Sequence, residues 1–177
     1  MTSRTIIARA PSRQFMALTI GAGLLLNLLP WSPEWYVPDF LAVILVFWGI
    51  HAPGRIGLFA AWALGLLMDI HQGSALGQQA LIYASLLYFG SALQRRLSGF
   101  SVPGQAAHLA ALFALAALMT VLLRWSSDGS LPDASIVILV GANTLCWMAT
   151  TNLLLGLLSR RARPSRARVG SRARTSA

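Results

Sequence analysis

Long apolar stretches, separated by short polar breaks, run through most of this chain. The stretch 136–158, for example, contains no charged residue. A helix needs about 20 predominantly apolar residues to cross the hydrocarbon core of a bilayer, which is roughly 30 Å thick. Hydrophobic residues also make up 56% of the 177 residues, above the roughly 45–50% that is usual for a soluble domain. The sequence therefore predicts an all-α integral membrane protein.

A bundle of about six transmembrane helices is predicted. Two of them are short and share the polar break 69–79, part of which is expected to dip into the membrane, where protein or water must cover its backbone. Pro38 and Asp39 mark the start of the second helix, because proline fits the first turn and the helix dipole favours an anion there. The predicted spans are 15–29, 38–50, 56–68, 80–93, 103–123 and 136–158.

The distribution of arginines predicts the orientation. All 14 basic residues are arginines; 13 of them fall on the same side as the two termini, and Arg124 alone falls on the other. Positive residues are enriched in cytoplasmic segments, so both termini are predicted to be cytoplasmic. The predicted organisation is a basic cytoplasmic N-terminus at 1–14, a membrane domain at 15–158, and a disordered, arginine-rich cytoplasmic tail at 159–177.

The basic tail accounts for much of the net charge of +9. Seven arginines lie between positions 160 and 174, with few apolar residues among them. Such a segment next to a membrane helix is attracted to anionic lipids. Anionic lipid is therefore the expected partner of the tail, and no nucleic-acid partner is predicted.

A stripe of small residues marks one face of the third predicted helix. Gly57, Ala61, Gly65 and Asp69 recur at intervals of four, and small faces allow helices to pack closely. The stripe places Asp69 toward protein at the carboxyl end of its helix, where the dipole disfavours an anion. A compensating contact is expected from a polar side chain, a partner protein or interfacial water, the candidate side chains being His71, Gln78 and Gln79.

A tight turn is predicted after this helix, between Gly73 and Gly77, with Ser74 capping the fourth helix. The fifth and sixth helices carry residues that fit association within the bundle, with a polar cavity or a partner helix as the alternative. They are the small residues Ala106, Ala110, Ala114 and Ala117, and the polar residues Asn143, Thr144, Thr150, Thr151 and Asn152.

The sequence contains no pattern that indicates catalysis. His51 and His108 each lack a second ligand at metal spacing on the same helix. The single Cys146 lies within an apolar run and cannot form an intrachain disulfide. Neither an enzyme activity, nor a metal site, nor a cofactor is predicted.

Four short motifs, in this order and spacing, resemble the family of the bacterial rod shape-determining protein MreD. The resemblance covers most of the membrane region and is strongest between residues 38 and 96. The motifs are Val37-Pro38-Asp39-Phe40, Pro53-Gly54-Arg55-Ile56-Gly57, Gly65-Leu66-Leu67-Met68-Asp69 and Gly73-Ser74-Ala75-Leu76-Gly77.

The resemblance implies a multi-pass protein of the bacterial inner membrane. Its implied role is non-enzymatic: it would link MreC, cytoplasmic MreB filaments and peptidoglycan synthases in the cell-elongation machinery. The family also implies a fold like that of substrate-binding subunits of vitamin transporters, so a small-molecule-binding subunit is the alternative. Together with the stripe, the resemblance nominates as structural or interaction residues Pro38, Asp39, Arg55, Gly57, Ala61, Gly65, Asp69, Gly73 and Gly77.

Overall fold

The computed structural model describes residues 12–31, 37–97, 99–129 and 135–162. These residues form six α-helices and no strand, which confirms the all-α prediction. Most of the predicted basic N-terminus and arginine-rich tail lies outside the described residues. The helices are α1 (Arg13–Leu28), α2 (Phe40–His51), α3 (Leu58–Gln72), α4 (Gln78–Leu97), α5 (Val102–Asp128) and α6 (Ser135–Ala162).

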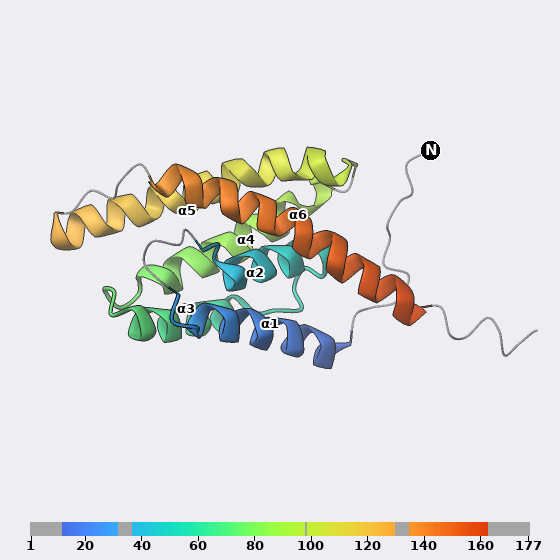
Figure 1. Cartoon of the computed structure of the whole chain (residues 1–177), viewed down its shortest axis with the longest axis horizontal. Helices are drawn as coiled ribbons and strands as arrows, with labels where there is room; N and C mark the ends of the chain where they lie inside the picture. The colour runs from blue at the N-terminus through green and yellow to red at the C-terminus, as the bar shows by residue number, and fades with distance from the viewer. Residues whose placement is uncertain (1–11, 32–36, 98, 130–134, 163–177) are drawn as a thin grey trace, which may run out of the picture.

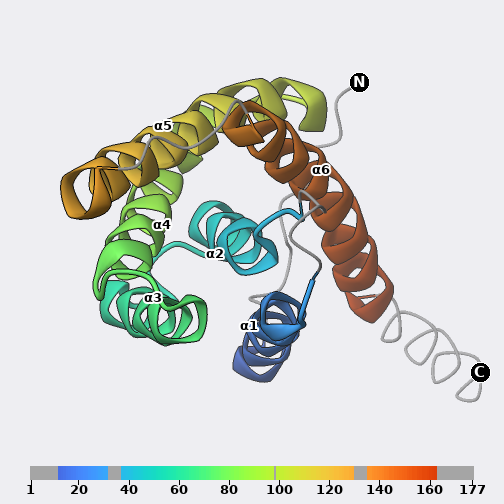
Figure 2. The ribbon, with the colours of Figure 1, turned by 60° about the vertical axis from the view of Figure 1, so that its left-hand side comes forward.

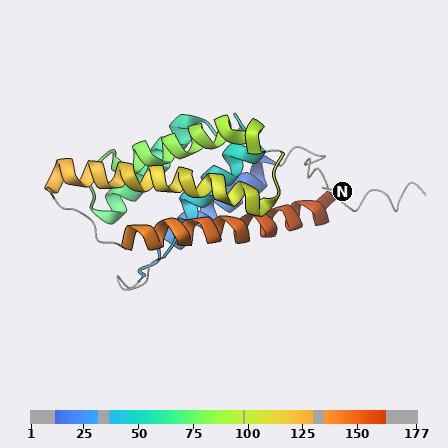
Figure 3. The ribbon, with the colours of Figure 1, turned by 90° about the horizontal axis from the view of Figure 1, so that it is seen from above.

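Successive helices run in alternating directions (Figures 1 and 3). The ends of α1, α3 and α5 therefore lie at the same end of the bundle as the starts of α2, α4 and α6. The start of α1 and the end of α6 lie together at the opposite end (Figure 1). We call the end at which α2, α4 and α6 start the polar end, because the buried polar residues Asp69 and Gln78 lie there.

Helix α2 is the centre of the bundle. It packs against α1, α4 and α6, and Figure 2 shows it enclosed by the other helices. Residues 41–50 are all buried. Its sequence explains this position, because it is apolar on every side until His51 and has no polar face to turn outward.

Helices α3 and α4 form a closely packed hairpin. Ala61, Gly65 and Asp69 of the small stripe are buried, whereas Gly57 precedes α3 and is exposed. A Cβ atom on Gly65 would lie 2.6 Å from the carbonyl carbon of Gln79 and would overlap the backbone of Ala80. The small face of α3 is therefore occupied by α4 of the same chain.

Helix lengths differ from the predictions at several ends. The break between α3 and α4 covers only 73–77, shorter than the predicted 69–79, and α5 continues past its predicted end at residue 123 to Asp128. Two helical stretches, Val102–Ser126 and Ile136–Ser159, are long and apolar enough to cross a membrane. At a rise of 1.5 Å per residue, the 12 residues of α2 span only about 18 Å.

Substituting Gly65→Ala should destabilise the α3–α4 hairpin. The added methyl group meets backbone atoms, which cannot move aside as a side chain can, and overpacking of this kind typically costs about 1–3 kcal/mol. Thermal unfolding of the purified protein in detergent would measure the loss. Gly141→Ala in α6 is the control, because a Cβ there meets nothing within 4 Å; equal stability of both variants would contradict the close packing.

Candidate functional site

Asp39 joins three helices at the polar end of the bundle. It is the N-cap of α2, and its Oδ1 atom accepts hydrogen bonds from the Ala42 amide at 2.9 Å and from Asn27 Nδ2 of α1 at 2.7 Å. The Tyr83 hydroxyl of α4 donates to Oδ2 at 2.8 Å. One carboxylate therefore caps α2 and attaches α1 and α4 to it.

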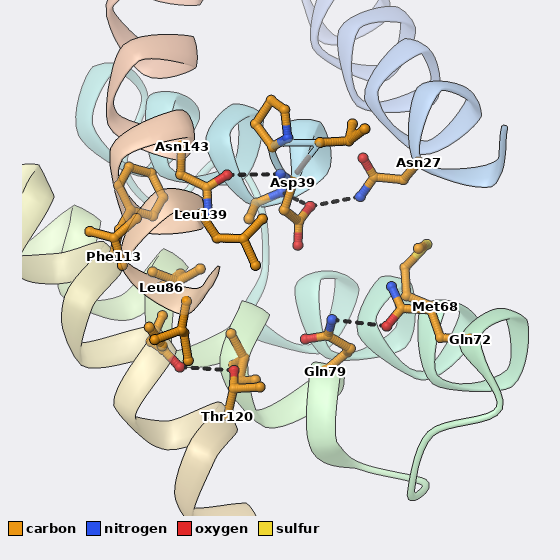
Figure 4. Close-up of a pocket in the computed structure, with 18 of the residues that line it drawn as sticks. Asn27, Asp39, Met68, Gln72, Gln79, Leu86, Phe113, Thr120, Leu139 and Asn143 are labelled. Atoms are coloured by element: carbon orange, nitrogen blue, oxygen red, sulfur yellow. Dashed lines mark hydrogen bonds between the residues drawn. The ribbon is translucent and has the colours of Figure 1, made fainter. Parts of the chain in front are cut away.

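The backbone at the start of α2 is held by two asparagine side chains. Asn143 Oδ1 of α6 accepts from the Asp39 amide at 2.8 Å, and Asn27 Oδ1 accepts from the Phe40 amide at 3.0 Å. Figure 4 shows Asn27 and Asn143 approaching Asp39 from opposite sides. The first amides of a helix have no partner within the helix, and an unpaired amide in apolar surroundings is costly. These side chains therefore allow the start of α2 to lie half-buried among the other helices.

Asp69 performs the same task for α4. Its side chain is completely buried. Oδ1 accepts from the Gln79 amide at 2.7 Å and the Ser74 hydroxyl at 2.9 Å, while Oδ2 accepts from the Gly77 amide at 2.9 Å. The carboxyl end of the α3 dipole disfavours the Asp69 anion, and the amides at the amino end of α4 stabilise it.

These contacts correct two predictions about the turn. Ser74 does not cap α4; it donates its hydroxyl to Asp69, and Asp69 is the capping group. Of the side chains predicted to compensate Asp69, none does so in the described structure; Gln79 contributes through its backbone amide. Gly73 and Gly77 have φ angles of 63° and 99°, which non-glycine residues rarely adopt, so they allow the short turn that brings α4 back to Asp69.

A cavity of about 330 Å³ opens beside Asp39 at the polar end. Figure 4 shows its wall built from several helices, with Asp39 and Asn143 on one side and Gln72 and Gln79 on another. The polar residues that line it are Asn27, Asp39, Gln72, Gln79, Thr120, Arg124 and Asn143. The rest of the wall is mainly apolar and includes Met68, Ile82, Leu86, Phe113, Leu139 and Val140.

No group of three or more His, Cys, Asp or Glu side chains capable of holding a metal occurs in the described residues. The rings of His51 and His108 bond to carbonyl oxygens in their own helices, those of Phe47 and Gly104. At the polar end, Asp39 and Asp69 act as helix caps, and Asn27, Tyr83 and Asn143 connect helices.

A comparison with protein family models identifies the family of this chain. The family model of the rod shape-determining protein MreD matches residues 12–158, which include all six helices almost completely. The chain belongs to the MreD family. The resemblance of the four motifs is thereby confirmed.

One curated relative of this MreD family chain is the rod shape-determining protein MreD of Haemophilus influenzae. It is 31% identical over 65 residues, which are 36% of this chain and 40% of the relative. The alignment thus spans less than half the length of the relative. No solved structure matches the chain.

The MreD motif residues fall in different parts of the fold. Pro38 and Asp39 line the cavity. Gly65, Asp69, Gly73 and Gly77 build the α3–α4 hairpin, together with Ala61 of the stripe. Arg55 and Gly57 are exposed in the turn between α2 and α3, at the other end of α2 from Asp39.

Sequence reasoning missed two members of the Asp39 cluster, Asn27 and Tyr83. Each is a polar group within a mainly apolar helix. Such groups usually bond to a neighbouring helix, so their position in the sequence could have indicated these contacts. Asn143 was predicted to serve helix association or a polar cavity, and it lies at both the α2–α6 contact and the cavity wall.

Substituting Asp69→Asn should weaken the hairpin of this MreD family member more than Ser74→Ala. In Asn an NH2 group replaces one carboxylate oxygen, and its nitrogen cannot accept a hydrogen bond. The donors to that oxygen, Gln79 and Ser74 at Oδ1 or Gly77 at Oδ2, therefore lose their acceptor. Ser74→Ala removes one hydrogen bond to a charged acceptor and should cost about 1.5–3 kcal/mol, and Asp69→Asn should cost more, because it removes the charge and leaves buried donors without an acceptor. Unfolding in detergent measures both, and the reverse ranking would refute the capping role of Asp69.

Proposed function

We propose that this protein is a non-enzymatic inner-membrane component of the cell-elongation machinery, where it holds partner proteins together. The observation that carries the proposal is the family match over residues 12–158. Membership of the MreD family supports a role in determining rod shape. The family is a structural one and no known enzyme family, and no reaction is proposed for this chain.

We further propose that residues 15–158 cross the membrane six times, with the basic segments 1–14 and 159–177 in the cytoplasm. The partition of the 14 arginines supports this orientation, and the alternating helix directions agree with an even number of crossings. Helix α2 is shorter than the ~30 Å core. Its amino end would therefore lie below the membrane surface, covered by protein as Asn27 and Asn143 cover it.

Reporter fusions test this topology. A fusion after Gly129, between α5 and α6, should be active only with a periplasmic reporter such as alkaline phosphatase, because Arg124 is the only arginine on that side. A fusion at the end of the tail should be active only with a cytoplasmic reporter. The opposite activities at either site would overturn the arrangement.

The proposed partners are MreC, MreB through direct or indirect contact, and the peptidoglycan synthases of the elongation complex, with anionic lipids at the tail. Because the segments between helices are short, most contacts with partners would lie within the membrane. The small face of α3 is already covered by α4, which removes it from the surfaces available to a partner. On α5, Ala114 is exposed and Ala110 is half-buried, so the face that these two residues share is the preferred surface for the anchor helix of MreC.

Substituting Ala114→Leu should reduce the amount of MreC that copurifies and should round the cells, while the protein still inserts in the membrane. Added bulk on a packed helix face typically costs about 1–3 kcal/mol. The control is Ala63→Leu, the same change at an exposed position on α3. Equal recovery of MreC with both variants would show that this face of α5 does not bind MreC.

The alternative function is a small-molecule-binding or transport subunit, and the cavity beside Asp39 is the observation that favours it. Depletion of the protein separates the two. Loss of rod shape supports assembly. Normal rods, combined with loss of saturable uptake of a metabolite, would replace assembly with transport.

A further inference from the structure

The cavity at the polar end has no place in the assembly role described above. Its volume of about 330 Å³ lies within the range of small-molecule sites, roughly 300–1,000 Å³. Like those sites, it combines a mainly apolar wall with a few converging polar groups. Residues of α3, α4, α5 and α6 all line the cavity, so it is not a packing gap between two helices.

Several polar groups of the wall have capacity left for a ligand. Asn143 uses its Oδ1 atom on the Asp39 amide, and its Nδ2 group makes no hydrogen bond within the described part of the chain. Gln79 and Gln72 share one bond of 3.3 Å through one amide group each. Each keeps its other amide atom for a further donor or acceptor, and the Thr120 hydroxyl, which donates to the Ala116 carbonyl, can still accept.

The part of the wall beside Asn143 is apolar. Leu86, Phe113 and Leu139 lie together next to Asn143 in Figure 4. These side chains can contact a ring or a short hydrocarbon chain while Asn143 bonds to a polar substituent. The arrangement suits an amphipathic molecule, with its polar group directed toward α2 and α6.

The charges select among such molecules. Asp39 repels an anion, and its two oxygens already accept from Asn27, Tyr83 and Ala42. A cation is not needed to compensate it. The described wall contains one acidic and one basic residue, Asp39 and Arg124, so it carries no net formal charge, and moving a charged ligand out of water into it would be costly.

We propose that this cavity is a binding site for a small neutral molecule in which an amide-like donor and acceptor group is attached to an apolar ring or chain. The site is independent of the assembly role. If the probes below do not bind, MreC can still copurify with the protein. If MreC does not copurify, the probes can still bind in this cavity.

Three probes of nearly equal shape test the charge selection: benzamide, benzoate and benzamidinium, which are neutral, anionic and cationic. Binding to the full chain in detergent is followed by ligand-observed NMR titration. Benzamide should bind saturably and at least about tenfold more tightly than either charged probe, a difference of roughly 1.4 kcal/mol. Benzoate or benzamidinium binding as tightly as benzamide, or no saturable binding of benzamide, would overturn the proposal.

Two variants of α5 locate the binding. Ala117 lines the cavity, so Ala117→Phe should fill it and weaken benzamide binding at least about tenfold. Ala111 is exposed on the same helix and does not line the cavity, so Ala111→Phe should bind benzamide like the unaltered chain. Equal binding by both variants would place benzamide elsewhere, in the micelle or on another surface. An anionic phospholipid retained by the unaltered chain and lost from Ala117→Phe would assign the cavity to a charged lipid and also overturn the proposal.

Discussion

The structure depends on satisfying the amino end of a short helix that is buried on all sides. Helix α2 is apolar along its length and packs against three neighbours, and because its start is half-buried, its first backbone amides have restricted access to water. Asp39, Asn27 and Asn143 accept from three of these amides. In a low-dielectric interior each such bond is strong, and each missing one is expensive. The position of α2 therefore requires polar side chains from α1 and α6 at this end of the bundle.

The α3–α4 hairpin repeats this solution with a different acid. Asp69 accepts from the amides of Gly77 and Gln79, so the last turn of α3 and the first turn of α4 share one carboxylate. Gly65 allows the two helices to approach until their backbones touch. Three of the four motifs thus serve one architecture in this chain: the first caps the central helix, and the third and fourth build the hairpin beside it.

The two ends of the bundle differ in character as a result. The polar end contains the buried caps and the cavity. The opposite end carries exposed arginines, among them Arg13, Arg55 and Arg96, and it is the end at which both described termini lie. The long helices α5 and α6 expose much of their apolar surface. The bundle therefore presents three kinds of surface: a basic end, a polar end with a cavity, and apolar sides.

The sequence by itself determined that the chain is all-helical and roughly where each helix lies, because apolar runs and the prolines and glycines between them act over a few residues. It also placed Ala61, Gly65 and Asp69 on one face of α3, since that periodicity is local. The partners of the two acids were decided by tertiary structure. Asp39 bonds to residues 12, 44 and 104 positions away, and Asp69 ends up on backbone amides, which every sequence contains and no pattern singles out. Which donor reaches which carboxylate depends on how the helices pack, and that is a property of the whole bundle.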